Sequence, residues 1–289
     1  MSQADARRIT FLLLLTPFLL WILLLVVIPH IDMFLLSIRE KIAPRVYETG
    51  FANYVELFSE PVYIHTLLRT VVMSVAATGL TLVLAFPVSY YIAKMARGRV
   101  KSVLFLACLL PFWVSELVRV FGWMILLRET GVVSSLLQWS GLVSAPVELL
   151  YNDATVMVGL VYTSMLFMVV PLVSTLGSLD ESLVEAGYDL GGGSFGVLRE
   201  IVIPHAMPGI VAGCIIVFML TLGNYLTPTL LGGKSGLWFT GHIYSQFITR
   251  FNWEFGAAFG FVLLGTSSLI VWLALRLSGQ TLASTIAKS

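Results

Sequence analysis

Charged side chains are scarce in this sequence. Of its 289 residues, 11% are Asp, Glu, Lys or Arg, whereas 58% are hydrophobic and the mean hydropathy is +0.92. A soluble globular domain carries about 25% charged residues, so this chain has too few charges to cover the surface of a soluble protein of its size. Much of the surface must therefore face lipid, and we expect an integral membrane protein.

Other absences argue against whole classes of function. The net charge is +1, and no stripe of Lys and Arg exists outside one short loop, so nucleic acid is not an expected partner. The two cysteines, Cys108 and Cys214, lie in separate apolar runs without metal-ligand spacing, and we interpret both as small buried hydrophobes. No Ser/His/Asp or paired-carboxylate pattern suggests catalysis. We expect no metal, no cofactor and no catalytic residue in this chain.

Six long apolar segments are present. A helix needs about 20 apolar residues to cross the hydrocarbon core of a bilayer. The segments that meet this length are 9–28, 66–93, 102–127, 154–176, 209–231 and 256–277. The first resembles a signal peptide because Arg7 and Arg8 precede it, but it is as long as a span and no small-residue cleavage site follows. The sequence therefore predicts one all-α transmembrane domain over 1–289, with an uncleaved first helix.

The distribution of Lys and Arg predicts the orientation. The loop 94–101, between the second and third predicted spans, has four cations in eight residues. Short loops rich in Lys and Arg stay in the cytoplasm. Both chain termini and the long segment 177–207 are then expected on the cytoplasmic side.

The segment 177–207 contains a short amphipathic pattern. Leu183, Ala186, Gly187 and Leu190 follow the spacing i, i+3, i+4, i+7, which places them on one helical face. Such a helix is too short to be stable alone. The small residues at the centre of this face permit close approach of another surface. Two interpretations remain open: the helix docks a partner, or it packs on its own bundle.

A longer motif runs through this segment. Glu185-Ala186-Gly187, three residues, Gly191, nine residues and Ile201-x-Ile203-Pro204 together resemble the "EAA" signature of binding-protein-dependent ABC importer permeases. That signature reads Glu-Ala-Ala, three residues, Gly, nine residues, Ile-x-Leu-Pro. Gly187 stands in place of the second Ala and Ile203 in place of Leu, and both are mild changes of size. Other stretches, such as Pro111-Phe112-Trp113, resemble the polyamine branch of this family.

The resemblance carries expectations about fold and partners. It implies a type I (MetI-like) ABC importer permease with six transmembrane helices in the bacterial inner membrane, performing no chemistry itself. It also implies two ATPase subunits that hold ATP and Mg²⁺, a second homologous permease and a periplasmic solute-binding protein. The ATPase would be contacted through a coupling segment, whose residues would be Glu185, Ala186, Gly187, Leu190, Gly191, Ile201 and Pro204.

The polyamine branch suggests spermidine or putrescine as the solute. That branch also shades into permeases for other small amines, amino-acid derivatives, opines and iron chelates. Two rivals come from other classes. An ion-coupled secondary transporter would need intramembrane carboxylates and usually internal repeats, whereas this chain has one such Glu and no visible repeat. A membrane enzyme would need a converging catalytic set, which is missing.

Polar residues inside the predicted spans are candidates for a solute pathway. Glu116 and Arg119 are three residues apart in the third span. They either form a structural ion pair, lie at a helix end in the headgroup zone, or face a cavity. In the fifth span, polar residues next to Pro228 either line or gate the pathway or make ordinary interhelical hydrogen bonds. Aromatic side chains nearby suit an organic cation. The candidate pathway residues are Trp113, Glu116, Arg119, Asn224, Tyr225 and Thr227.

Overall fold

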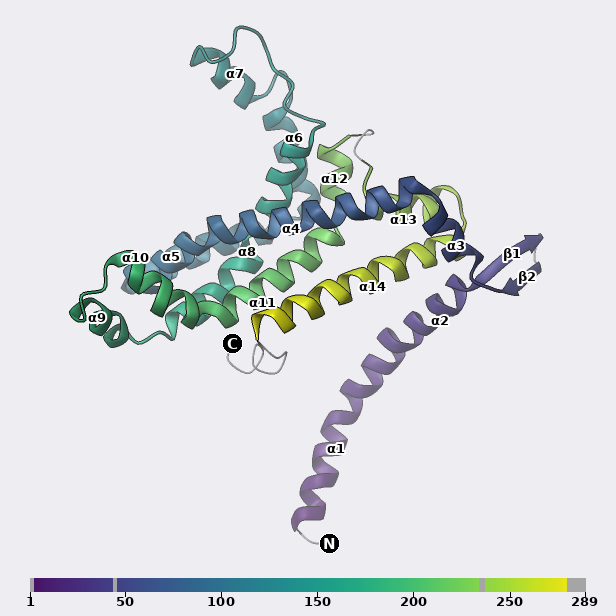
Figure 1. Cartoon of the computed structure of the whole chain (residues 1–289), viewed down its shortest axis with the longest axis horizontal. Helices are drawn as coiled ribbons and strands as arrows, with labels where there is room; N and C mark the ends of the chain where they lie inside the picture. Colours follow the sequence, from purple (N-terminus) through teal and green to yellow (C-terminus); the bar gives the residue numbers. More distant parts are fainter. Residues whose placement is uncertain (1–2, 44–45, 234–236, 280–289) are drawn as a thin grey trace. The chain divides into compact units, whose positions relative to one another are not determined.

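The computed structural model describes residues 3–43, 46–233 and 237–279, and these residues are mainly helical (Figure 1). Six helical stretches are long and apolar enough to cross a membrane, which confirms the predicted all-α, six-span class. They are Phe11–Ser37, Pro61–Met95, Glu116–Trp139, Asp153–Gly177, Ser194–Leu222 and Trp253–Ser278. The chain divides by its internal contacts into two compact units, Met1–Ile64 with His242–Gly265, and His65–Gly241 with Thr266–Ser289.

The first unit begins with one long helix. Helix α1 (Gln3–Ile22) continues through a π-helical turn, Leu23–Val27, into α2 (Ile28–Ser37). Its first span therefore extends beyond the predicted 9–28. Large apolar side chains along it are exposed, as expected for a helix whose solvent is lipid.

A small polar structure follows this helix where the sequence suggested only a loop. Strands β1 (Arg39–Ala43) and β2 (Val46–Thr49) form an antiparallel hairpin, and α3 (Ala52–Ser59) follows. The Asn53 amide Nδ2 donates to the backbone oxygens of Ser37, at 3.0 Å, and Arg39, at 2.7 Å. This amide fixes the end of α2 and the start of β1 to α3.

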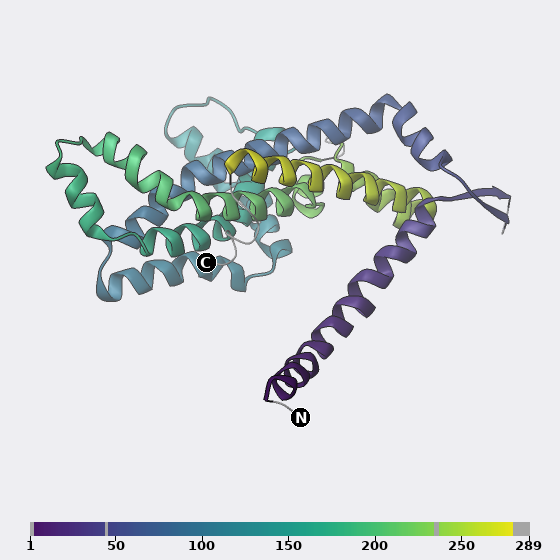
Figure 2. The same cartoon turned by 60° about the horizontal axis from the view of Figure 1, so that its bottom comes forward.

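Figure 1 labels most of the remaining helices, and Figure 2 shows the same helices from a second direction. In chain order they are α4 (Pro61–Tyr90) with a π-helical turn Tyr91–Met95, α5 (Gly98–Leu109), a 3-10 turn Leu110–Trp113, α6 (Glu116–Leu127), α7 (Val132–Trp139), α8 (Asp153–Gly177), α9 (Glu181–Asp189), α10 (Ser194–Val197) with a π-helical turn Leu198–Val202, α11 (Ile203–Leu222), α12 (Leu226–Leu231), α13 (Phe239–Tyr244) with a π-helical turn Ser245–Thr249, and α14 (Trp253–Ser278).

Helices α8 and α11 form the centre of the second unit and lie side by side (Figure 1). Met168 and Leu172 of α8 are fully buried in this core. On α11, Gly209 and Gly213 face α8 so closely that an added Cβ at Gly209 would lie 2.2 Å from Thr175 Oγ1. Small residues four apart allow two membrane helices to approach at the backbone, where packing is the main stabilising term in lipid.

Two predicted spans are not continuous helices. The predicted span 102–127 is interrupted because α5 ends at Leu109 and residues 114–115 are extended before α6 begins. Pro111 lies in the 3-10 turn at this break and lacks the N–H that a continuous helix needs. The predicted span 209–231 is also wrong in its bounds. Helix α11 runs from Ile203 to Leu222, and residues 223–225 separate it from α12.

Candidate functional site

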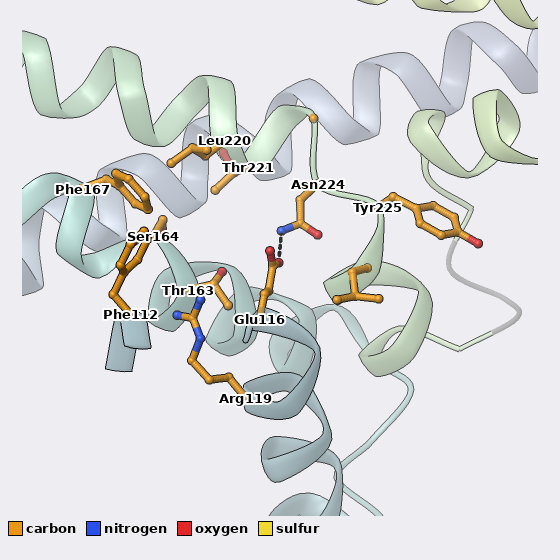
Figure 3. A pocket seen from close by; sticks show the side chains of 12 residues that line it. Phe112, Glu116, Arg119, Thr163, Ser164, Phe167, Leu220, Thr221, Asn224 and Tyr225 are labelled. Atoms are coloured by element: carbon orange, nitrogen blue, oxygen red, sulfur yellow. Dashed lines mark hydrogen bonds between the residues drawn. The ribbon is translucent and has the colours of Figure 1, made fainter. Parts of the chain in front are cut away.

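A cavity of about 440 Å³ lies in the second unit, where both helix interruptions meet (Figure 3). Its walls come from the start of α6, the middle of α8 and the break between α11 and α12. The lining residues are Phe112, Glu116, Arg119, Thr163, Ser164, Phe167, Leu220, Thr221, Gly223, Asn224, Tyr225 and Leu226. The two groups of polar residues that the sequence placed in different spans therefore share one cavity.

The carboxylate of Glu116 is held by neutral donors. Asn224 Nδ2 donates to Glu116 Oε1 at 2.7 Å, and Thr227 Oγ1 donates to the same oxygen at 3.4 Å. Figure 3 shows the Glu116 and Asn224 side chains pointing toward each other. Because Glu116 is the first residue of α6, its charge also lies at the positive end of that helix. The break in the third span thus positions an acidic group in the cavity.

Arg119 lies one turn further along α6 and also lines the cavity. Of the interpretations that the sequence left open, the structural ion pair with Glu116 is not formed, and both side chains line the cavity. Within the described ranges, the single pair of opposite charges within 4.0 Å is Arg69 with Asp153, at 2.5 Å. The Nε atom of Arg119 is buried and has no hydrogen-bond partner among the described residues. The cavity therefore contains one acidic and one basic group that do not neutralise each other by direct contact.

The aromatic wall differs from the predicted one. Trp113 is 76% exposed and does not line the cavity, because the 3-10 turn directs Phe112 there instead. Phe112 packs edge-to-face on Phe167 of α8, with ring centroids 5.7 Å apart. Tyr225 does line the cavity, although its ring is directed away from Glu116 (Figure 3). Thr227 does not line it but contributes through its hydrogen bond to Glu116.

The residues of α8 that line the cavity were not predicted from the sequence. Thr163, Ser164 and Phe167 fall on adjacent turns of this helix and line the cavity together. A polar pair followed by an aromatic residue four positions later was the available signal, but the same pattern also fits ordinary helix packing.

The segment between α8 and α11 holds α9 in a defined place. Asp180 precedes the helix, and its Oδ1 accepts a hydrogen bond from the Ser182 backbone N–H at 3.0 Å. This backbone hydrogen bond lowers the pKa of the Asp180 carboxyl group. The Lys94 ammonium donates to the backbone oxygen of Leu179, and Ser178 Oγ lies 3.2 Å from His205 Nε2. The cationic loop 94–101 and α11 are thus both joined to the start of α9.

The predicted apolar face of α9 is divided between two environments. Leu183 is 52% exposed, Leu190 is 89% exposed and Ala186 is also exposed. Gly187 faces the same chain instead, since an added Cβ there would lie 2.6 Å from Ile201 Cδ1. For Gly187 the structure therefore favours the second of the two interpretations, packing on the chain's own bundle.

The other residues of the motif shape the chain around α9. Glu185 is exposed on the helix. Gly191 has φ +84°, a conformation that favours glycine and ends the helix. Pro204 directly follows the π-helical turn Leu198–Val202 inside the continuous helical stretch Ser194–Leu222, and its missing N–H accompanies this local change of helical geometry. The predicted loop 177–207 consequently contains the short helix α9 and the first turns of the continuous helical stretch Ser194–Leu222.

Six apolar spans, together with a cavity that has polar walls, are typical of a membrane transport protein. The family model described as "Binding-protein-dependent transport system inner membrane component" matches residues 85–282, a range that includes both α9 and the cavity. The chain belongs to this family and is an inner-membrane permease subunit of an ABC importer.

Curated relatives cover most of the chain. The spermidine/putrescine transport system permease protein PotB of Escherichia coli is 33% identical over 262 residues, covering 89% of this chain and 94% of PotB. PotB of Haemophilus influenzae is 31% identical over 258 residues, covering 89% and 90%. The E. coli inner membrane ABC transporter permease protein YdcU is 35% identical over 226 residues, covering 74% and 72%.

Solved structures support the fold. A bacterial ABC transporter involved in the import of the acidic polysaccharide alginate matches with a TM-score of 0.76 and 20% identity, covering 96% of this chain and 97% of that one. The same kind of transporter in complex with an alginate-bound periplasmic protein gives a TM-score of 0.72. At this identity the likeness concerns the fold alone, and it agrees with the predicted type I permease architecture.

Proposed function

We propose that this permease imports a small organic cation of the polyamine type, such as spermidine or putrescine. It would work with a second homologous permease, two ATPase subunits that hold ATP and Mg²⁺, and a periplasmic solute-binding protein. The names of the PotB relatives support the solute class. The observation that carries the proposal is the Glu116 carboxylate in a cavity walled by Phe112 and Phe167, because carboxylates and aromatic faces both attract organic cations.

Arg119 in the same cavity fits a pathway better than a tight binding site. Its positive charge offsets part of the attraction that Glu116 exerts on a cation. A transported solute must bind well enough to enter and weakly enough to leave. The periplasmic binding protein would then select the solute, and the permease cavity would supply a shallow attractive site on the way through.

Glu116→Gln tests this proposal in the reconstituted complex. A cation 4 Å from a carboxylate gains roughly 4 kcal/mol at an effective dielectric constant of 20, before desolvation costs. We expect the transport KM for spermidine to rise at least tenfold, which corresponds to about 1.4 kcal/mol. Uptake into vesicles should require ATP and should survive collapse of the proton gradient. Glu129→Gln, which removes an exposed carboxylate just after α6, is the matched control. An unchanged KM in Glu116→Gln would remove the carboxylate from the pathway.

The proposed orientation places α9 in the cytoplasm. Ser182 is exposed on α9, whereas Ser144 is exposed in the segment between α7 and α8. In a chain with Cys108 and Cys214 replaced by Ala, a membrane-impermeant maleimide added to intact cells should label Ser144→Cys and leave Ser182→Cys unmodified. Permeabilised cells should show labelling at both positions. Efficient labelling of Ser182→Cys in intact cells would show that α9 lies outside the cytoplasm and that the proposed orientation is wrong. The first two and last ten residues of the chain lie outside the described part of the structure.

A further inference from the structure

Asn224 joins three separate segments of the second unit. It lies in the break between α11 and α12, where its backbone N–H donates to the Thr221 oxygen at 3.3 Å and three further atoms make hydrogen bonds. Its Nδ2 donates to Glu116 Oε1 at 2.7 Å, and its Oδ1 accepts from the Thr227 backbone N–H at 2.9 Å. Its backbone oxygen accepts from Thr240 Oγ1 at 2.9 Å. One residue therefore connects the cavity carboxylate, the first turn of α12 and the chain that follows α12.

The chain after α12 is in turn fixed to α4. The Phe239 backbone N–H donates to Thr70 Oγ1 at 3.0 Å, and the Arg69 guanidinium reaches the backbone oxygen of Leu237 at 3.5 Å. Arg69 also pairs with Asp153 at the start of α8. Helix α12 is thus held at its beginning through Asn224, at its last residue by the Tyr151 backbone N–H, which donates to the Leu231 oxygen at 2.8 Å, and beyond its end through α4. Thr227, Pro228 and Leu231 of α12 are also buried. The six residues of α12 cannot form a stable helix alone, so these attachments help to determine its position.

The hydrogen bond between Asn224 and Glu116 is the attachment that a cation in the cavity can replace. Asn224 offers Glu116 a neutral amide donor, whereas an ammonium group offers a charged one. An ammonium donor adds the attraction between two opposite charges, which the neutral amide lacks. A cation that enters the cavity therefore competes directly with Asn224 for Glu116 Oε1.

We propose that Asn224 is a latch that keeps the break between α11 and α12 closed on the cavity until a cationic solute takes over the Glu116 carboxylate. Asn224 acts as a positioning residue, since it sets this break through Glu116 rather than by binding solute. The solute-triggered release rests on the proposed function of the cavity as a site for an organic cation. The closed latch itself rests on the hydrogen bonds alone and can be tested without any solute.

The test measures basal ATP hydrolysis by the reconstituted complex without solute or binding protein. Asn224→Ser removes the donor to Glu116, while serine still provides a hydroxyl that suits the start of α12. Glu116→Leu removes the acceptor. We expect each change to raise basal hydrolysis at least threefold, and the double variant to raise it no further than either single one. Residues that act through one shared contact show this lack of additivity. Thr229→Val, which removes a hydroxyl bonded only within the α12 region, is the control and should leave hydrolysis unchanged.

The outcomes separate the latch from the solute. Wild-type basal hydrolysis in Asn224→Ser, or full additivity in the double variant, would overturn the latch and leave the proposed function standing. If Asn224→Ser does not assemble, Thr240→Val decides instead, because it loses the bond to the Asn224 backbone oxygen and should also raise basal hydrolysis. With loaded binding protein, stimulation of hydrolysis should be large in the wild type and close to onefold in Asn224→Ser. If basal ATP hydrolysis is raised in Asn224→Ser but the wild type takes up no spermidine, the proposed solute is wrong and the latch is still supported.

Discussion

Gly209→Ala should prevent the permease from accumulating as a folded subunit, although it adds a single methyl group. The added Cβ would lie 2.2 Å from Thr175 Oγ1 and 2.6 Å from the Pro171 backbone oxygen. The threonine side chain can rotate, but the carbonyl belongs to the α8 backbone and cannot move without separating α8 from α11. Overpacking a core costs about 1–3 kcal/mol. Because the added Cβ meets a backbone atom of α8, we expect the cost of Gly209→Ala to lie at or above the upper end of this range.

Two other glycines provide graded controls for this experiment. At Gly213 the nearest atom to an added Cβ is Met168 Sδ, at 2.7 Å, which can yield because methionine is flexible. At Gly79 of α4 no atom of the described residues lies within 4 Å, and alanine there should gain helix propensity of about 1 kcal/mol. Size-exclusion chromatography of tagged protein in detergent should rank folded yield as Gly79→Ala, then Gly213→Ala, then Gly209→Ala. Equal yields for Gly209→Ala and Gly79→Ala would contradict the close α8–α11 packing.

The six spans were predictable because hydrophobicity and length are properties of a continuous segment. The breaks inside them were partly predictable. Pro111 signals the interruption after α5, since proline removes a helix hydrogen bond. A weaker signal marks the end of α11, because Gly223 at the C-cap and Asn224 after it are residues that commonly follow the end of a helix. The contact between Glu116 and Asn224 joins residues 108 positions apart, and local periodicity contains no information about such a pair.

The coupling segment shows a second limit of periodicity. The spacing of Leu183, Ala186, Gly187 and Leu190 predicts a shared face and helix α9 contains it, but spacing does not say what each part of the face meets. In the structure, Val197 and Ile201 fold back onto Gly187 and leave both leucines exposed. The small residue at this position thus permits packing inside the chain. A docking surface, if α9 has one, must be sought along the exposed leucines.

We expect the double change Leu183→Glu and Leu190→Glu to release the ATPase from the permease. These two leucines and Ala186 form an exposed apolar stripe on α9, which we propose to be buried by the ATPase in the assembled importer. Burying a leucine contributes about 1.5–3 kcal/mol, so losing two weakens binding by roughly 100-fold or more. Two new carboxylates would also have to be desolvated in the contact, which adds to the loss.

Tyr188→Glu is the matched control for this change. Tyr188 is also exposed, at 47%, but it lies on the side of α9 away from the stripe, so the same kind of substitution should leave the contact intact. The amount of ATPase that co-purifies with tagged permease, measured together with solute uptake, gives the answer. The permease itself should fold normally in both variants, because none of these side chains belongs to its buried core. Loss of the ATPase only in the leucine variant would place the contact on the stripe. Full retention of the ATPase in both variants would exclude α9 as the coupling element, and the contact would then lie on another surface of the chain.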